Sequence, residues 1–225
     1  VQALLDAYPF EFYTDPTLAG KMTGYSWFSS SAARKAVNAG YADIIPAYYR
    51  DFPTRIRTEY DYDAVCVEVA PMDRHGYFSL ALNGSYIDAM LDKTKRIFLE
   101  VNDRQPRGLC GSLIHISQVD AIVEYNHDLP VLPPVQLDEV SKTIGGLIAE
   151  RIPDGACLQL GIGAIPDATG MALKAKHDLG IHTEMFTDSM VELIECGAVN
   201  NSKKQIHRGK TVTTFAFGSQ RIYDF

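Results

Sequence analysis

A glycine-rich loop between a predicted strand and a predicted helix places the strongest constraint on how this chain folds. The run Cys157–Leu160 has the apolar pattern of a short strand, and Pro166 fits the first position of the next helix, where no backbone N–H is required. Between them, Gly161 and Gly163 allow the backbone to turn sharply and to approach a ligand closely. The pattern predicts a βα unit whose exposed N–H groups could hold a phosphate or a developing oxyanion.

Helical and strand patterns alternate along the chain, which is the order of an α/β fold. The predicted strands are Ala64–Val69, Ile97–Val101, a short one near Ile181, and Thr211–Phe217, after which no further helix is expected. The predicted helices are Ala32–Ala39, Tyr86–Lys93, Asp138–Ile152, Asp167–Ala175 and Met190–Cys196. In the Asp138–Ile152 helix, the expected buried face consists of Val140, Ile144, Leu147 and Ile148.

A proline-rich segment divides the chain. The run Leu129–Leu137 contains three prolines and has neither a helical nor a strand period, which is typical of a linker. A chain of 225 residues is long enough for two domains. We therefore expect one domain over residues 1–130 and a second over residues 135–225.

Composition and charge exclude several protein classes. The 46% hydrophobic and 22% charged residues are typical of a soluble globular protein. No apolar run approaches the ~20 residues needed to span a bilayer, and a net charge of −7 provides no general attraction for nucleic acid. We expect neither membrane insertion nor nucleic-acid binding.

The cysteines indicate a reducing compartment. Cys66, Cys110, Cys157 and Cys196 are widely spaced, with no CxxC pair, so neither a disulfide framework nor a structural zinc site is predicted. No basic segment followed by an apolar run opens the chain. The predicted location is the cytoplasm.

Generic catalytic motifs are missing from the sequence. It contains no GxxxxGK phosphate loop and no GxSxG elbow, and Pro166 spoils the GxGxxG dinucleotide pattern, which disfavours a nucleotide-dependent dehydrogenase. His182 and Glu184 share one face of the expected strand, and Asp188 could join them as metal ligands. Because no other histidine is positioned to complete such a site, no metal is predicted.

The residues alone leave several interpretations open. Glu184 follows the loop at the expected carboxyl end of a neighbouring strand, where ligands of such sheets bind. It could act in catalysis or be an ordinary solvated carboxylate, and the loop could be only a tight βα turn. His75 could line a site or hold a polar turn. A basic group could be a solvated hairpin or contact a cofactor phosphate; it comprises Lys203, Lys204, His207, Arg208 and Lys210.

Longer runs resemble a known family. They cover nearly the whole chain beyond its first thirty or so residues. The most specific are Asp154–Asp167, Leu179–Asp188, Phe217–Ser219 and Tyr223–Phe225, with upstream runs at Arg34–Val37, Ala42–Pro46, Ala70–Leu80, Glu100–Asn102 and Ile114–Ser117. In these runs the chain resembles the acetyl-CoA hydrolase/transferase family, and most of all its butyrate and 4-hydroxybutyrate CoA-transferases.

The resemblance implies a fold and a site. The fold would be two related open-sheet α/β domains of the CoA-transferase type, with the second domain incomplete, because family members continue past Phe225 to another glycine-rich segment. Glu184 would be the nucleophile. The CoA-binding loop would comprise Gly161, Ile162, Gly163, Ala164 and Ile165. The family also suggests a homodimer that acts on acyl-CoA and short-chain carboxylates, with no permanently bound cofactor.

Three functions follow from this resemblance. The first is CoA transfer by a ping-pong mechanism, through a glutamyl-CoA thioester on Glu184. The second is hydrolysis of acyl-CoA, for which water would be the acceptor. The third is ligand binding without catalysis.

Overall fold

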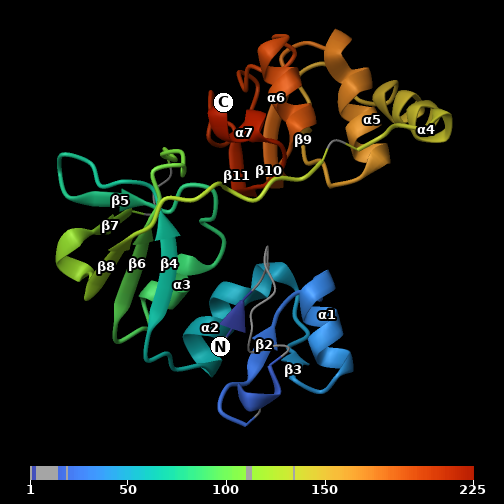
Figure 1. The fold of residues 1–225 in the computed structure, drawn as a ribbon. Coiled ribbons are helices and arrows are strands. Elements are labelled where there is room, and N and C mark those ends of the chain that lie inside the picture. The colour runs from blue at the N-terminus through green and yellow to red at the C-terminus, as the bar shows by residue number, and fades with distance from the viewer. Residues whose placement is uncertain (1, 4–14, 19, 110–112, 134) are drawn as a thin grey trace. The chain divides into compact units, whose positions relative to one another are not determined.

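The computed structural model describes residues 2–3, 15–18, 20–109, 113–133 and 135–225. The chain divides into two compact units, Val1–Tyr60 and Asp61–Phe225. Its three-stranded sheets are open and parallel, and helices connect their strands (Figure 1). The predicted α/β fold class is confirmed.

The first unit is built on a small parallel sheet in the order β1-β2-β3. Its elements are β1 (Gln2–Ala3), η2 (Pro16–Leu18), β2 (Gly24–Ser26), α1 (Ser31–Asn38), β3 (Ala42–Ile44), η3 (Tyr49–Asp51) and α2 (Phe52–Glu59). Ser30 caps α1, because its hydroxyl accepts a hydrogen bond from the N–H of Ala33 at 3.1 Å. This cap confirms the predicted helix to within one residue.

The second unit begins with a parallel sheet in the order β4-β6-β8. Its strands are β4 (Val65–Val69), β6 (Ile97–Val101) and β8 (Ala121–Glu124). Along the chain, α3 (Ile87–Leu91) lies between β4 and β6, and η4 (Ile116–Gln118) lies between β6 and β8. An antiparallel pair joins β5 (Tyr77–Ser79) to β7 (Leu113–His115). Since all three strands of the sheet run in the same direction, their carboxyl ends lie at one edge. The predicted strands β4 and β6 are confirmed, whereas α3 is shorter than predicted.

The second unit contains another parallel sheet, in the order β11-β10-β9, and the remaining helices belong to this part of the chain. Its elements are α4 (Glu139–Ala149), β9 (Cys157–Leu158), α5 (Ala164–Ala172), η5 (Leu173–Ala175), β10 (Gly180–Phe186), α6 (Asp188–Glu195), β11 (Val212–Ala216) and α7 (Gln220–Asp224). The core beneath it includes the fully buried side chains of Leu173, Leu179, Ile181, Val191 and Leu193. Helix α7 follows the last strand, so the expectation of no helix there was wrong.

Helix α4 buries a different face from the predicted one. Val140 and Leu147 are 65% and 50% exposed. The buried positions are Ser141, Gly145 and Ala149, which are small residues four apart. Small side chains allow the backbone of α4 to approach α5 so closely that a Cβ atom on Gly145 would lie 2.7 Å from the carbonyl carbon of Ala168. Backbone proximity, and not a stripe of large apolar side chains, sets this packing.

The predicted linker, Leu129–Leu137, has no helix or strand in its described residues, 129–133 and 135–137. The linker is held against the part of the chain that forms the β11-β10-β9 sheet. Leu129 is buried in that core, the Tyr223 hydroxyl donates to the Pro130 carbonyl at 2.6 Å, and the Leu132 N–H donates to the Gly218 carbonyl at 2.8 Å. A domain boundary near residue 130 stays a prediction.

Cys66, Cys157 and Cys196 are exposed free thiols, and Cys110 lies outside the described residues. In the described part of the chain, every helix is too short or too polar to cross a membrane.

Candidate functional site

The glycine loop opens directly into helix α5. Gly163 is the N-cap residue, and the helix begins at Ala164, three residues before the predicted start at Asp167. Pro166 is therefore the third helical residue and not the first. It is tolerated there because no N–H in the first turn has an intrahelical partner. Ala164 and Ile165 consequently belong to the first turn, where their N–H groups face the end of the helix.

The two loop glycines have different structural roles. Gly163 has φ 116° and ψ 176°, a conformation that side-chain-bearing residues rarely adopt. Gly161 has no such requirement, and a Cβ atom on it would meet only the Pro166 Cγ atom, at 3.9 Å. The fold thus needs glycine at position 163, whereas Gly161 keeps space open beside the helix start.

We expect Gly163→Ala to lower the free energy of unfolding by roughly 1–3 kcal/mol, because alanine is strained at this positive φ. Gly161→Ala should change it by less than about 0.5 kcal/mol. Urea unfolding of both variants measures the difference. Equal losses of stability would contradict these assigned roles.

Glu184 lies within β10, two residues before the strand ends at Phe186, and not at the strand end as predicted. Its side chain is exposed, on the opposite face from the buried Thr183 and Met185. The Glu184 carbonyl accepts hydrogen bonds from the hydroxyls of two residues of β11, Thr213 at 3.0 Å and Thr214 at 2.5 Å. The backbone that carries this carboxylate is therefore held on the β11 side.

The structure places the glycine loop next to Glu184. Strands β9 and β10 pair in parallel, and beyond the paired residues the Thr183 hydroxyl donates to the Leu160 carbonyl at 3.2 Å. Gly161 directly follows Leu160, and Glu184 directly follows Thr183. The first residue of the loop and the predicted nucleophile therefore lie on adjacent chain segments.

The loop residues Ile162 and Gly163 line part of a pocket of about 700 Å³. Its walls include Ile162, Met171 and Phe217, together with Leu132 from the linker. Glu184 is not among its lining residues. The pocket is mostly apolar, with a few acidic and hydroxyl groups near the start of α6.

One of these acidic groups, Asp167, is destabilised in its charged form. Burial raises the pKa of its carboxyl above the usual range; a hydrogen bond with Ser189 opposes this effect, and the charges of Asp188 and Glu192 add to it. Because the folded-state pKa exceeds the unfolded one, ionisation of Asp167 costs stability as the pH rises through these values.

Asp167→Asn should therefore be more stable than the wild type at pH 7. The gain should shrink as the pH falls toward about 3.9, the usual pKa of an unfolded aspartate, where both states bind the proton. Urea unfolding from about pH 7 to about pH 4 measures this dependence. A difference in stability that does not change with pH would contradict it.

The metal ligands considered from the sequence do not come together. The Asp188 carboxylate accepts hydrogen bonds from the Ser219 N–H, at 3.0 Å, and from the Ser219 hydroxyl. Among the described residues, the triplet whose potential ligand atoms lie within 4.8 Å of one another does not include His182, Glu184 or Asp188. It is Glu68, Glu100 and His127, a group that no sequence pattern indicated.

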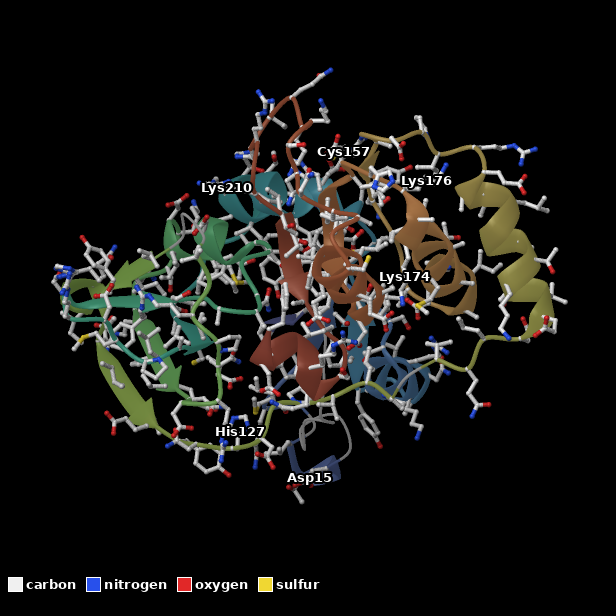
Figure 2. The ribbon with its side chains drawn as sticks, turned by 90° about the horizontal axis from the view of Figure 1, so that it is seen from above. Asp15, His127, Cys157, Lys174, Lys176 and Lys210 are labelled. Atoms are coloured by element: carbon white, nitrogen blue, oxygen red, sulfur yellow. The ribbon has the colours of Figure 1, made fainter. Side chains whose placement is uncertain are left out.

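The basic group near β11 is in part structural. Lys204 is only 5% exposed, and its ammonium donates to the carbonyls of Ile181 at 2.7 Å and Lys210 at 2.6 Å. The interpretation as a solvated hairpin is therefore wrong for Lys204, whereas Lys203, His207, Arg208 and Lys210 are exposed. Figure 2 shows Lys210 in the segment that leads into β11.

His75 belongs to a polar turn. Asp73 holds this turn, because its Oδ1 atom accepts the N–H groups of His75 and Tyr77, each at 2.9 Å. His75 therefore lies in a polar turn, and the side chain that holds this turn is that of Asp73.

Comparison with known proteins shows extensive similarity. Residues 6–133 match the model of the acetyl-CoA hydrolase/transferase N-terminal domain. The chain is 45% identical over 200 residues to a succinyl-CoA:cyclohexane-1-carboxylate CoA transferase of Geobacter metallireducens, covering 89% of this chain and 46% of that protein. It is 42% identical over 199 residues to the 4-hydroxybutyrate coenzyme A transferase of Clostridium kluyveri, and the match covers 88% of this chain and 46% of that protein.

Solved structures agree with these matches. RipA from Yersinia pestis has a TM-score of 0.85 at 37% identity, over 89% of this chain and 48% of that one. A 4-hydroxybutyrate CoA-transferase from Porphyromonas gingivalis has a TM-score of 0.79 at 33% identity, over 90% of this chain and 53% of that one. The chain spans about half the length of the curated relatives it matches.

Proposed function

Since this chain belongs to the acetyl-CoA hydrolase/transferase family, we propose that the protein transfers coenzyme A between a short-chain acyl-CoA and a carboxylic acid. Acetyl, butyryl and 4-hydroxybutyryl groups are the acyl groups we propose. The names of similar proteins support transfer as the reaction class. The structural observation that carries the proposal is the position of an exposed carboxylate, Glu184, beside a glycine loop at a helix start.

Glu184 is the proposed nucleophile. Its carboxylate attacks the acyl carbonyl carbon of acyl-CoA, and the CoA thiolate leaves with the electron pair of the broken C–S bond, which gives an acyl-glutamyl anhydride. The thiolate then attacks the glutamyl carbonyl and releases the acyl group as its carboxylate. The product is a glutamyl-CoA thioester, and a second carboxylic acid reverses both steps to leave as the new acyl-CoA. The thioester energy is kept throughout.

The loop is proposed to bind CoA and to stabilise the negative charge of each attack. Every attack places that charge on a carbonyl oxygen, and an N–H donor aimed at such an oxygen typically contributes ~3 kcal/mol. The first-turn N–H groups of Ala164 and Ile165 are suitable donors, and the helix dipole has the favourable sign. The full set of proposed CoA-binding residues is Gly161, Ile162, Gly163, Ala164 and Ile165.

The domain division is also proposed. We place an N-terminal CoA-transferase domain over residues 1–130 and part of a related domain over residues 135–225. The end of the matching N-terminal family model at residue 133 and the proline-rich segment there support this division. A homodimer and a cytoplasmic location stay predictions, as does the absence of a permanently bound cofactor.

Gly161→Ala tests the proposed role of the loop. The new methyl group would occupy the open space beside Pro166 at the start of α5, so we expect kcat/KM for acyl-CoA to fall by roughly 10- to 100-fold, as when a bound substrate is displaced by about an ångström. Steady-state kinetics of the full-length protein measures the change, with Gly146→Ala on α4 as a matched control. An unchanged kcat/KM would contradict a close approach of substrate at Gly161.

The acceptor distinguishes transfer from the other two functions. Full-length protein is incubated with acyl-CoA, with and without acetate or butyrate. Transfer predicts a new acyl-CoA that forms only when the acid is present. Release of free CoA at the same rate in both reactions would indicate a hydrolase, and no turnover would favour a ligand-binding protein.

A further inference from the structure

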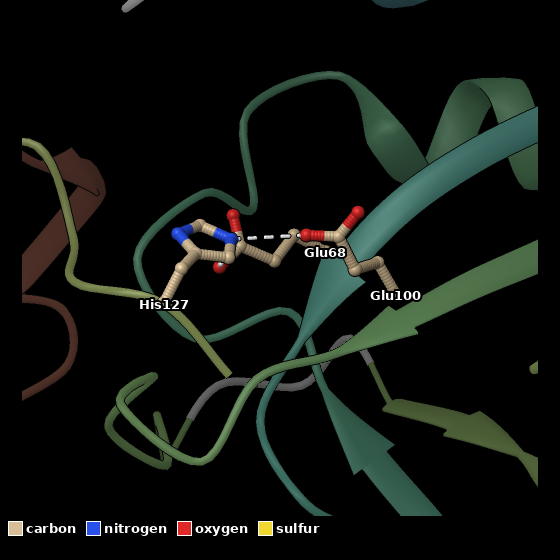
Figure 3. A group of neighbouring side chains, drawn as sticks. All are labelled: Glu68, Glu100 and His127. Carbon is tan, nitrogen blue, oxygen red and sulfur yellow. Dashed lines mark hydrogen bonds and ion pairs between the residues drawn. The ribbon is translucent and has the colours of Figure 1, made fainter. Parts of the chain in front are cut away.

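Two carboxylates face each other across the parallel strands β4 and β6. Glu68 and Glu100 are paired directly in the strand register, near the carboxyl ends of both strands. Like charges at opposed positions destabilise a sheet unless a positive charge lies between them. His127, which follows β8, supplies one nitrogen. Its Nε2 atom lies 3.0 Å from the Glu100 Oε1 atom and 3.6 Å from the Glu68 Oε1 atom (Figure 3).

The other ring nitrogen of His127 has a backbone partner. Its Nδ1 atom lies 3.1 Å from the carbonyl oxygen of Asp128. Since a carbonyl oxygen can only accept, Nδ1 carries the proton. In the neutral imidazole, the lone pair is then on Nε2 and is directed at the two carboxylates. A backbone carbonyl on the distal nitrogen is the usual partner of a metal-binding histidine.

A buried asparagine fixes the geometry of the group. Asn102 is fully buried, and its side-chain amide donates to the Glu68 Oε1 atom at 2.7 Å and to the His127 carbonyl at 3.0 Å. Its Oδ1 atom accepts from the N–H of Arg104 at 3.0 Å. Hydrogen bonds of this kind orient metal ligands and hold them in place.

We propose that Glu68, Glu100 and His127 bind a divalent transition-metal ion, with Zn²⁺ as the preferred ion and water in the remaining position. Ligands about 2.1 Å from a tetrahedral zinc ion are about 3.4 Å apart, and the two measured separations bracket this value. One imidazole nitrogen and two carboxylate oxygens suit Zn²⁺, whereas Ca²⁺ and Mg²⁺ prefer oxygen ligands alone. All three side chains are partly exposed, which gives the ion access.

A proton competes with the metal for the same position. The hydrogen bond to the Asp128 backbone, followed by the bond to Glu100 and the charges of both glutamates, raises the pKa of His127, while burial opposes the shift. An imidazolium bridging the two carboxylates is therefore the alternative to a bound metal ion. The two arrangements differ in whether the protein takes up zinc.

The test is zinc binding by the full-length protein. After dialysis against a chelator, titration calorimetry should show Zn²⁺ bound at this site with a Kd of micromolar or below, and added Zn²⁺ should raise the Tm. Co²⁺ should give visible absorption bands of a site with nitrogen and oxygen ligands. His127→Gln and Glu100→Gln should each lower the zinc affinity at least tenfold, whereas His177→Gln, which alters an exposed histidine outside the group, should not.

Two results would overturn the proposal. One is the absence of zinc binding, with no rise in Tm, which would leave only the imidazolium ion pair. The other is the same zinc affinity in wild type, His127→Gln and Glu100→Gln, which would place the bound ion elsewhere. Circular dichroism establishes that each variant is folded, and Glu100→Gln retains a hydrogen-bonding side chain if His127→Gln does not fold.

Discussion

Glu184→Gln is expected to lower kcat/KM for CoA transfer by about 10³-fold or more while the fold stays intact. The glutamine amide cannot attack an acyl carbonyl, so neither the anhydride nor the thioester can form. Stability should change little, because the side chain is exposed. Within the described part of the chain, its carboxylate makes no hydrogen bond or ion pair. Steady-state transfer assays on the full-length protein measure the loss.

A matched charge change separates this effect from general electrostatics. Glu150→Gln removes the same charge from an exposed position at the end of α4 and should leave kcat/KM within about twofold of the wild type. Urea unfolding establishes that both variants are folded. Transfer activity that survives in Glu184→Gln would show that another group is the nucleophile.

Gly145→Ala should give a large loss of stability, about 1–3 kcal/mol of unfolding free energy. The added methyl group would lie 2.7 Å from two backbone atoms of α5, the carbonyl carbon of Ala168 and the nitrogen of Thr169. Backbone atoms cannot turn aside as a flexible side chain can, so the two helices must separate. This cost exceeds the stabilisation of about 1 kcal/mol that alanine provides over glycine inside a helix.

The adjacent glycine provides the control. A Cβ atom on Gly146 would meet no atom within 4 Å, so Gly146→Ala should be neutral or more stable by up to about 1 kcal/mol. Urea unfolding of both variants measures the difference. Shifts of the same sign and size would contradict the close packing of α4 on α5.

Local signals were sufficient to predict several elements. The apolar run of β6 gave its bounds correctly, and Asp138, which caps α4, marked the start of that helix. The predicted start of α5 was wrong, because it was placed from Pro166 and proline is tolerated throughout the first turn of a helix. The buried face of α4 was also wrong, since it depends on how closely α5 approaches, which no local pattern encodes.

The arrangement of the candidate site also depends on contacts that no local sequence pattern encodes. Residue type and the family resemblance indicated Glu184 and the glycine loop, but their adjacency follows from the pairing of β9 with β10. Lys204 was misinterpreted because its partners are backbone carbonyls supplied by the fold. The group of Glu68, Glu100 and His127 was missed altogether. Its members come from separate segments, and only the strand register brings them together.

The covalent intermediate is the most direct test of the central claim. Full-length protein is incubated with acyl-CoA in the absence of an acid acceptor, digested, and analysed by mass spectrometry. We expect the peptide that contains Glu184 to gain the mass of CoA, less one water, and to lose it when the acid is added. If a preparation that catalyses transfer shows no such adduct on Glu184, the proposed mechanism is contradicted.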